Sequence, residues 1–163
     1  MANFVRYFLV AVGVFVIGLG AALVLGLYRL PVGKVADVNF SELVLSHKPN
    51  QYLVCPPGLC GATAHAESPV FNLDAIELRT KWLAWAAGQD GLEPLGAQPV
   101  GMQMNFVERS LVLGFPDVIT VRFLAIDNGK SSIAIYSRSV YGYSDLGVNR
   151  DRIQRWLDGF GRW

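Results

Sequence analysis

The chain of 163 residues is long enough for one domain and an accessory segment, and 52% of its residues are hydrophobic, which is high for a soluble domain. Its 14 basic and 13 acidic residues nearly balance and form no block of one sign, so the sequence carries no footprint of nucleic-acid binding. We therefore expect an apolar segment outside an ordinary core and no nucleic-acid partner.

The apolar excess is concentrated near the N-terminus. Residues 7–28 contain no charged side chain and are flanked by Arg6 and Arg29. A helix needs about 20 residues to cross the hydrocarbon core of a bilayer, whereas the apolar region of a cleaved signal peptide has only about 7–15. We expect residues 1–33 to form an uncleaved single-span membrane anchor with its flank, and a cleaved signal peptide is the alternative.

Three small residues, Gly18, Ala22 and Gly26, recur at every fourth position of this segment. Because positions i and i+4 share a helix face, another helix could approach closely here. We interpret this face as a contact with other transmembrane proteins, although small residues are common in membrane helices generally. The flanking charges do not fix the orientation of the span.

Residues 34–163 are expected to form a single domain after the span. Residues 35–45 could hold a short strand. Residues 46–69 carry six proline and glycine residues, which predict irregular structure.

The two cysteines lie inside this irregular segment, with a Pro-Pro-Gly sequence between them. A turn of this length can bring the α-carbons of Cys55 and Cys60 within the roughly 4.4–6.8 Å of a disulfide, which would form in an oxidising compartment. The alternatives are free thiols or a metal site completed by His47 and His65. We expect the disulfide, no metal or cofactor, and a domain on the extracytoplasmic side of the inner (cytoplasmic) membrane.

A helix is predicted next, capped by Asn72 or Asp74 and ended by Gly88. Glu77 and Lys81 are spaced to pair on its exposed side. Its apolar side is formed by Ile76, Leu78, Trp82, Leu83, Trp85 and Ala86.

Apolar residues alternate from Gly101 onward, which predicts β-strands. Asn128 and Gly129 between the last two strands predict a hairpin with a two-residue loop, and therefore antiparallel pairing. The apolar strand faces are formed by Met102, Met104 and Phe106, then Ile119, Val121 and Phe123, then Ile133 and Ile135.

The chain ends in a second amphipathic helix, expected to be capped by Asn149 and to end near Gly159. Its apolar face is formed by Ile153, Trp156, Leu157 and Phe160. The predicted fold class is therefore α+β, with an antiparallel sheet packed against two helices.

The loop before this helix gathers glycines, short polar side chains and arginines. Arg150 and Arg152 lie in the first helical turn, where the macrodipole disfavours cations, so we expect a negative group nearby. One interpretation is a bound anion or lipid headgroup held by helix N-terminal amides and an arginine fork. The other is that Asp145 and Asp151 pair with these arginines. The residues of this candidate anion site are Arg138, Ser139, Ser144, Asp145, Asn149 and Arg150.

A serine hydrolase is the enzymatic alternative, with Ser137, Ser139 or Ser144 as nucleophile. That chemistry needs a base beside the serine, and both histidines lie far away in sequence, in the proline-rich segment. We therefore expect no catalytic residues, and we interpret the chain as a non-catalytic accessory or binding domain that supports a membrane or envelope complex.

The loop and its flanks form a long motif: Ser137, Arg138, Ser139, Gly142, Ser144, Asp145, Gly147, Asn149, Arg150 and Ile153. This motif resembles the terminal signature of domain-of-unknown-function family 1499, found in bacteria and plastids. The similarity extends over about residues 54–157, and the Cys-Pro sequence at Cys55 resembles the family's N-terminal marker. The chain departs from the family at residues 61–63, where a Ser-Ser pair is usual, and at residues 116–117, where paired acids are usual. The resemblance implies an uncharacterised membrane-anchored protein and supplies no activity.

Overall fold

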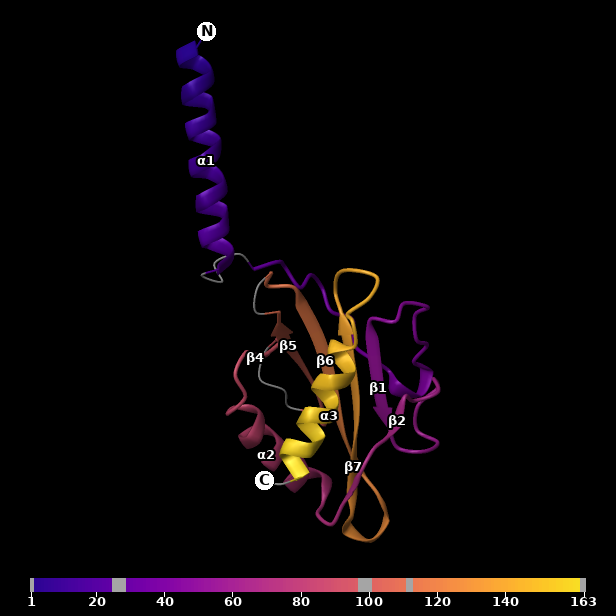
Figure 1. The fold of residues 1–163 in the computed structure, drawn as a ribbon. Helices are drawn as coiled ribbons and strands as arrows, with labels where there is room; N and C mark the ends of the chain where they lie inside the picture. The colour runs from indigo at the N-terminus through magenta and orange to yellow at the C-terminus, as the bar shows by residue number, and fades with distance from the viewer. Residues whose placement is uncertain (1, 25–28, 97–100, 111–112, 162–163) are drawn as a thin grey trace.

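The first element is a long helix that stands apart from the rest of the molecule. The computed structural model describes residues 2–24, 29–96, 101–110 and 113–161. Helix α1 (Ala2–Val24) begins before Arg6, and its stretch Asn3–Ala22 has a mean hydropathy of 2.1 with no part buried against the domain (Figure 1). It is long and apolar enough to span a membrane. Gly18 and Ala22 lie within it, whereas Gly26 lies outside the described residues.

The domain is built on one sheet in the order β2-β1-β7-β6-β5-β4, with β3 also paired to β7. All pairs are antiparallel except β1 with β2, so the predicted α+β class is confirmed, while the sheet is mixed rather than purely antiparallel. The strands are β1 (Gln51–Cys55), β2 (Ala66–Glu67), β3 (Val70–Phe71), β4 (Leu92–Pro94), β5 (Gln103–Arg109), β6 (Pro116–Ala125) and β7 (Ser131–Ser139).

Two predictions for the segment before the first helix of the domain were wrong. Residues 35–45 form no strand; a short 3-10 helix, η1 (Phe40–Glu42), stands there. Conversely, β1 lies within the segment predicted to be irregular and pairs with the central strand β7. Leu53 and Val54 are almost fully buried, and this burial depends on β7, which lies about eighty residues further along the chain.

The helices α2 (Ala75–Ala86) and α3 (Val148–Gly161) cover one face of the sheet (Figure 1). The carboxylate of Asp74 caps α2 by accepting hydrogen bonds at 2.8 Å from two backbone amides, and Lys81 pairs with Glu77 at 3.3 Å, as predicted. Ile76 is an error in the predicted apolar side, because it is 70% exposed. Two residues turn a helix by about 200°, so Ile76 points away from the buried Leu78.

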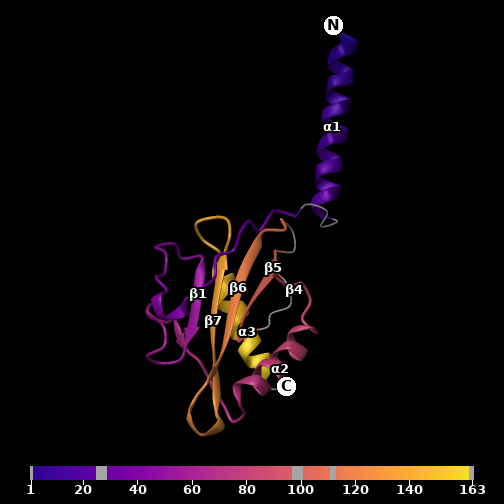
Figure 2. The ribbon, with the colours of Figure 1, turned by 180° about the vertical axis from the view of Figure 1, so that it is seen from behind.

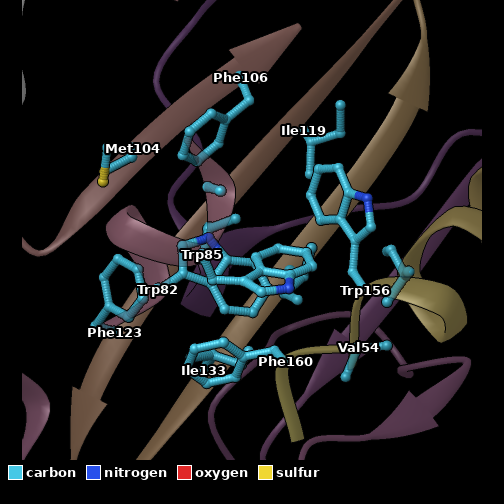
Figure 3. Packing of buried hydrophobic residues seen from close by; sticks show 14 of the residues in the cluster. Val54, Trp82, Trp85, Met104, Phe106, Ile119, Phe123, Ile133, Trp156 and Phe160 are labelled. Atoms are coloured by element: carbon cyan, nitrogen blue, oxygen red, sulfur yellow. The ribbon is translucent and has the colours of Figure 1, made fainter. Parts of the chain in front are cut away.

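The main core lies between these helices and the sheet, and aromatic side chains dominate it. Trp82 is fully buried, and its ring packs at centroid distances of 5.0–6.3 Å against Trp85, Phe123, Trp156 and Phe160 (Figure 3). These contacts join α2, α3 and β6, so Trp82 is the point at which both helices meet the sheet.

The other face of the sheet is covered by chain without long helices (Figure 2). Phe40 of η1 packs there with Leu53, Cys55 and Tyr136, and the Phe40 carbonyl accepts a hydrogen bond at 2.9 Å from the amide of Gly61. The segment after α1 and the chain around Cys60 therefore close this face together.

The predicted disulfide is present between Cys55 and Cys60, whose α-carbons are 6.3 Å apart. The two sulfur atoms are therefore bonded to each other. His65, considered as a metal ligand, instead accepts a hydrogen bond through Nδ1 from the Leu53 amide at 3.0 Å and stacks on Tyr52.

The hairpin between β6 and β7 is confirmed, but its loop is longer than predicted. The amide of Ile126 donates to the carbonyl of Lys130 at 2.8 Å, which leaves the three residues of η2 (Asp127–Gly129) between them. Asn128 and Gly129 both have positive φ, at 62° and 70°, which explains why the Asn-Gly sequence marks the turn.

The segment that follows α1 is tied to one end of the domain. Arg29 pairs with Glu93 at 2.9 Å, the Leu30 carbonyl accepts from Arg109 at 2.7 Å, and the Pro31 carbonyl accepts from the hydroxyl of Tyr141 at 2.8 Å. The end of the domain that carries the β7–α3 loop therefore faces α1 (Figure 1).

Candidate functional site

The loop between β7 and α3 is held by its own side chains. Asp145 caps α3 by accepting from the amides of Gly147 at 3.1 Å and Asn149 at 2.8 Å. Ser144 accepts from the amide of Leu146 at 3.2 Å. The prediction that Asn149 caps α3 was therefore wrong. Asn149 lies inside the helix, and Asp145 caps it.

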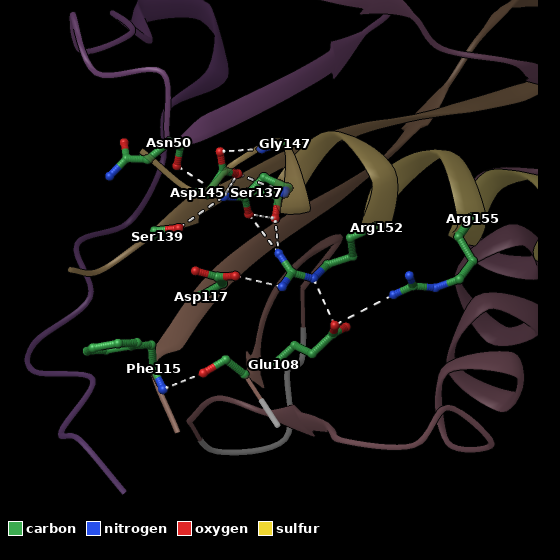
Figure 4. Close-up of polar contacts among 12 residues, drawn as sticks. Asn50, Glu108, Phe115, Asp117, Ser137, Ser139, Asp145, Gly147, Arg152 and Arg155 are labelled. Carbon is green, nitrogen blue, oxygen red and sulfur yellow. Dashed lines mark hydrogen bonds and ion pairs between the residues drawn. The ribbon is translucent and has the colours of Figure 1, made fainter. Parts of the chain in front are cut away.

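Asn149 is fully buried and connects three parts of the chain. Its side-chain amide group donates to the carbonyl of Asn50 at 3.1 Å, to Ser139 Oγ at 3.1 Å and to Asp145 Oδ2 at 2.7 Å. Its Oδ1 accepts from the hydroxyl of Ser137. The side chain thus locks the start of α3 to β7 and to the residue before β1. Figure 4 shows its partners Asn50, Ser137, Ser139 and Asp145 gathered at this point.

Arg152 continues this network into the core, with only 2% of its surface exposed. Its guanidinium donates to Asp117 at 2.6 Å, to Asn149 at 2.7 Å and to Ser137 at 3.1 Å. Its Nε lies 3.1 Å from Glu108 as an ion pair, although the angle falls short of a hydrogen bond. Three of these partners lie on three different strands and the fourth, Asn149, lies on α3 itself, so Arg152 joins α3 to β5, β6 and β7 (Figure 4).

The sequence interpretation assigned the wrong partners to one of the two arginines. Arg150 does pair with Asp151, at 2.9 Å, but Arg152 pairs with Asp117 and Glu108. In the structure, the register of β5 and β6 places Glu108 directly opposite Asp117. Like charges opposite each other in a sheet repel, so a cation between them is needed.

A cavity of about 230 Å³ opens beside the network, at the end of the domain that faces α1. Three of the predicted site residues, Ser139, Ser144 and Asp145, line it, and Asn149 is bonded to two of them. The remaining lining residues, which sequence reasoning did not assign to a site, are Ser110, Phe115, Asp117, Tyr141, Gly142 and Val148.

The structure does not bring the two arginines of the predicted fork together. Arg138 lies on the other face of the sheet, where it donates to Thr120 at 3.2 Å and its guanidinium lies 4.8 Å from the centre of the Tyr136 ring. Burial lowers the pKa of Arg138 and raises the pKa of Tyr136. Arg150 is exposed and lines a separate cleft of about 320 Å³. Its hydrogen bond with Asp151 raises its pKa.

The polar groups of the site are already hydrogen-bonded within the domain, which limits the chemistry they can perform. The hydroxyl of Ser137 is bonded to Asn149 and Arg152, and the carboxylate of Asp145 is bonded to the loop and to Asn149. Neither histidine lines the cavity. Among the described residues, no group of three or more His, Cys, Asp or Glu side chains is placed to hold a metal ion.

Comparison with known proteins yields one match. A family described as "Protein of unknown function (DUF1499)" matches residues 51–160. The matched region begins with β1 and ends in α3, so it contains the disulfide and the Arg152 network, and it agrees with the resemblance seen in the sequence. Neither the curated proteins nor the solved structures give a match.

Proposed function

The chain belongs to the DUF1499 family of proteins of unknown function, and because that membership supplies no activity, we propose from the structure itself that it is a membrane-anchored, non-catalytic accessory protein. In this proposal α1 crosses the inner membrane once, and the domain lies outside the cytoplasm and supports other components of a membrane or envelope complex. The observation that carries it is α1, whose apolar stretch Asn3–Ala22 is not buried against the domain. Such a surface is stable only when lipid or another apolar surface covers it.

The disulfide supports the extracytoplasmic position, because disulfides persist in oxidising compartments. Protein isolated from its own membrane with thiols blocked at lysis is expected to show no free thiol before reduction and two after it, since Cys55 and Cys60 are the only cysteines. A Cys55→Ser chain is the control and should show one thiol in both conditions. Two free thiols before reduction would contradict the proposed compartment.

The small-residue face of α1 supports a partner within the membrane. Gly18 and Ala22 lie one above the other on the helix, and none of the described residues occupies the space beside Gly18. We expect Gly18→Leu to remove a copurifying membrane partner from the tagged full-length protein in mild detergent, because leucine keeps another backbone from approaching.

The chain offers a matched control for this experiment. Gly20 lies about 200° around the helix from Gly18 and also has open space beside it, so Gly20→Leu adds the same volume on the other side and should retain the partner. If the protein purifies alone, or if both variants lose the partner equally, the small-residue face is not the contact.

The occupied hydroxyls support the non-catalytic part of the proposal. Ser137 is fully buried with its hydroxyl bonded to Asn149 and Arg152. Ser139 and Ser144 line the cavity, whose lining residues include neither histidine, the usual general base of serine catalysis. Covalent labelling of Ser137, Ser139 or Ser144 by a fluorophosphonate probe would overturn this part while leaving the anchor and partner experiments unaffected.

A further inference from the structure

The end of the domain that faces α1 carries an unusual number of exposed apolar side chains. They come from the turn before β6 and from the β7–α3 loop, two segments that meet at this end (Figures 1 and 2). We call them the apical patch, defined as Leu113, Phe115, Tyr141, Tyr143, Leu146 and Val148. Scattered apolar side chains are normal on a surface, but a contiguous group marks a contact with something apolar.

The apical patch is fixed to the segment that leaves α1. Tyr141, a member of the patch, donates to the carbonyl of Pro31, and Arg109 donates to the carbonyl of Leu30. Arg29 is the first charged residue after the apolar stretch, and two residues span at most about 7 Å. In the proposed anchor Arg29 lies at the level of the lipid headgroups, and two residues later Pro31 is hydrogen-bonded to Tyr141 of the patch.

Leu146 is the most informative member of the patch. It is 93% exposed, and its φ of 55° is a conformation that leucine rarely adopts. The loop holds it there through the Ser144 bond to its own amide and the Asp145 cap that follows. The backbone conformation is sterically unfavourable in any solvent, and the exposed side chain is unfavourable in water. Burial of the side chain in an apolar environment would offset both costs.

The composition of the patch fits the boundary between headgroups and acyl chains. Tyrosine places an apolar ring and a polar hydroxyl in that zone, and leucine inserts beside it. The two acids nearest the patch are already engaged, Asp117 by Arg152 and Asp145 by the loop amides, so their charges are compensated within the domain.

We propose that the apical patch rests on the lipid bilayer that holds α1, with Tyr143 and Leu146 inserted at the headgroup–acyl boundary. This inference rests on the proposed anchor and adds a second, peripheral contact between the same chain and the same membrane. The domain would then always turn the end that carries the apical patch toward the membrane surface. The 230 Å³ cavity, lined by Tyr141 and Val148 of the patch, would open at that surface.

The test uses single cysteines in the full-length chain, whose own two cysteines are joined. Leu146→Cys reports on the patch, Ile76→Cys is an exposed control at the far end of the domain, and Val14→Cys reports on α1. Each is labelled with an environment-sensitive fluorophore in nanodiscs of phosphatidylcholine and phosphatidylglycerol. Emission is then challenged with nitroxide-bearing lipid and with aqueous iodide.

We expect the label at position 146 to be quenched by lipid nitroxide and protected from iodide, and the label at position 76 to behave in the opposite way. If position 146 responds like position 76 while position 14 is quenched by lipid, the anchor stands and the docking proposal is wrong. If position 14 is quenched by iodide, the anchor fails and the docking fails with it. Protection of position 146 from both quenchers would show a protein cover and also overturn the lipid contact.

Discussion

Arg152→Ala is expected to lower the free energy of unfolding by about 3–5 kcal/mol, because it leaves two carboxylates partly buried without their cation. Asp117 and Glu108 face each other across β5 and β6, with side chains only 11% and 19% exposed. The same change also removes a donor from Ser137 and Asn149. The measurement is urea denaturation of the full-length protein in mild detergent, followed by tryptophan fluorescence.

Arg155→Ala is the matched control for this variant. Arg155 also approaches Glu108, at 3.6 Å, but its side chain is 66% exposed, so its loss should cost about 0–1 kcal/mol. A triple variant, Arg152→Met with Glu108→Gln and Asp117→Asn, removes the charges together and should recover part of the stability. Equal effects of Arg152→Ala and Arg155→Ala would show that the buried network does not hold α3 on the sheet.

Trp82→Ala is expected to cost about 3–5 kcal/mol of stability, since it empties the centre of the core. Four aromatic rings lose a packing partner, and α2 loses its deepest contact with the sheet. Thermal unfolding followed by circular dichroism measures the loss through a lower midpoint temperature.

Two further variants separate packing from polarity at this position. The buried indole N–H of Trp82 has no hydrogen-bond partner among the residues that the structure describes, so Trp82→Phe should lose no hydrogen bond and should cost clearly less than alanine. Ile76→Ala, on the exposed side of α2, should change stability by no more than about 0.5 kcal/mol. A tryptophan-to-alanine change as mild as the Ile76 control would mean that the core closes around the missing ring.

The elements that the sequence predicts correctly are those with local signals. The caps and periodicity of α2 and the Asn-Gly turn lie within a few residues of the structure they determine. Strand β1 had no such signal, because prolines flank it and the burial of Leu53 depends on pairing with Tyr136. The Arg152 network was missed for the same reason, since Glu108 and Asp117 reach it from other strands.

The alternation of side chains along a strand would have excluded the predicted arginine fork. Side chains alternate between the two faces of a strand, so Arg138 must point away from the face that Ile133, Ile135 and Ser137 share. The period of two was visible in the sequence, and it places Arg138 and Asn149 on opposite sides of the sheet. Ser139, Ser144 and Asp145 line one cavity because they lie within seven residues of one another in the chain.

The cover of the second sheet face has a mechanical consequence. Phe40 seals that face, yet it belongs to the stretch between α1 and β1, which lies outside the family-matched residues 51–160. The segment that joins α1 to the domain is therefore also part of the domain's core. Tension on the anchor would act first on the contacts of Arg29, Leu30 and Pro31 with the domain. Once these break, it would reach the core residue Phe40, so a pull on the membrane attachment would open the fold.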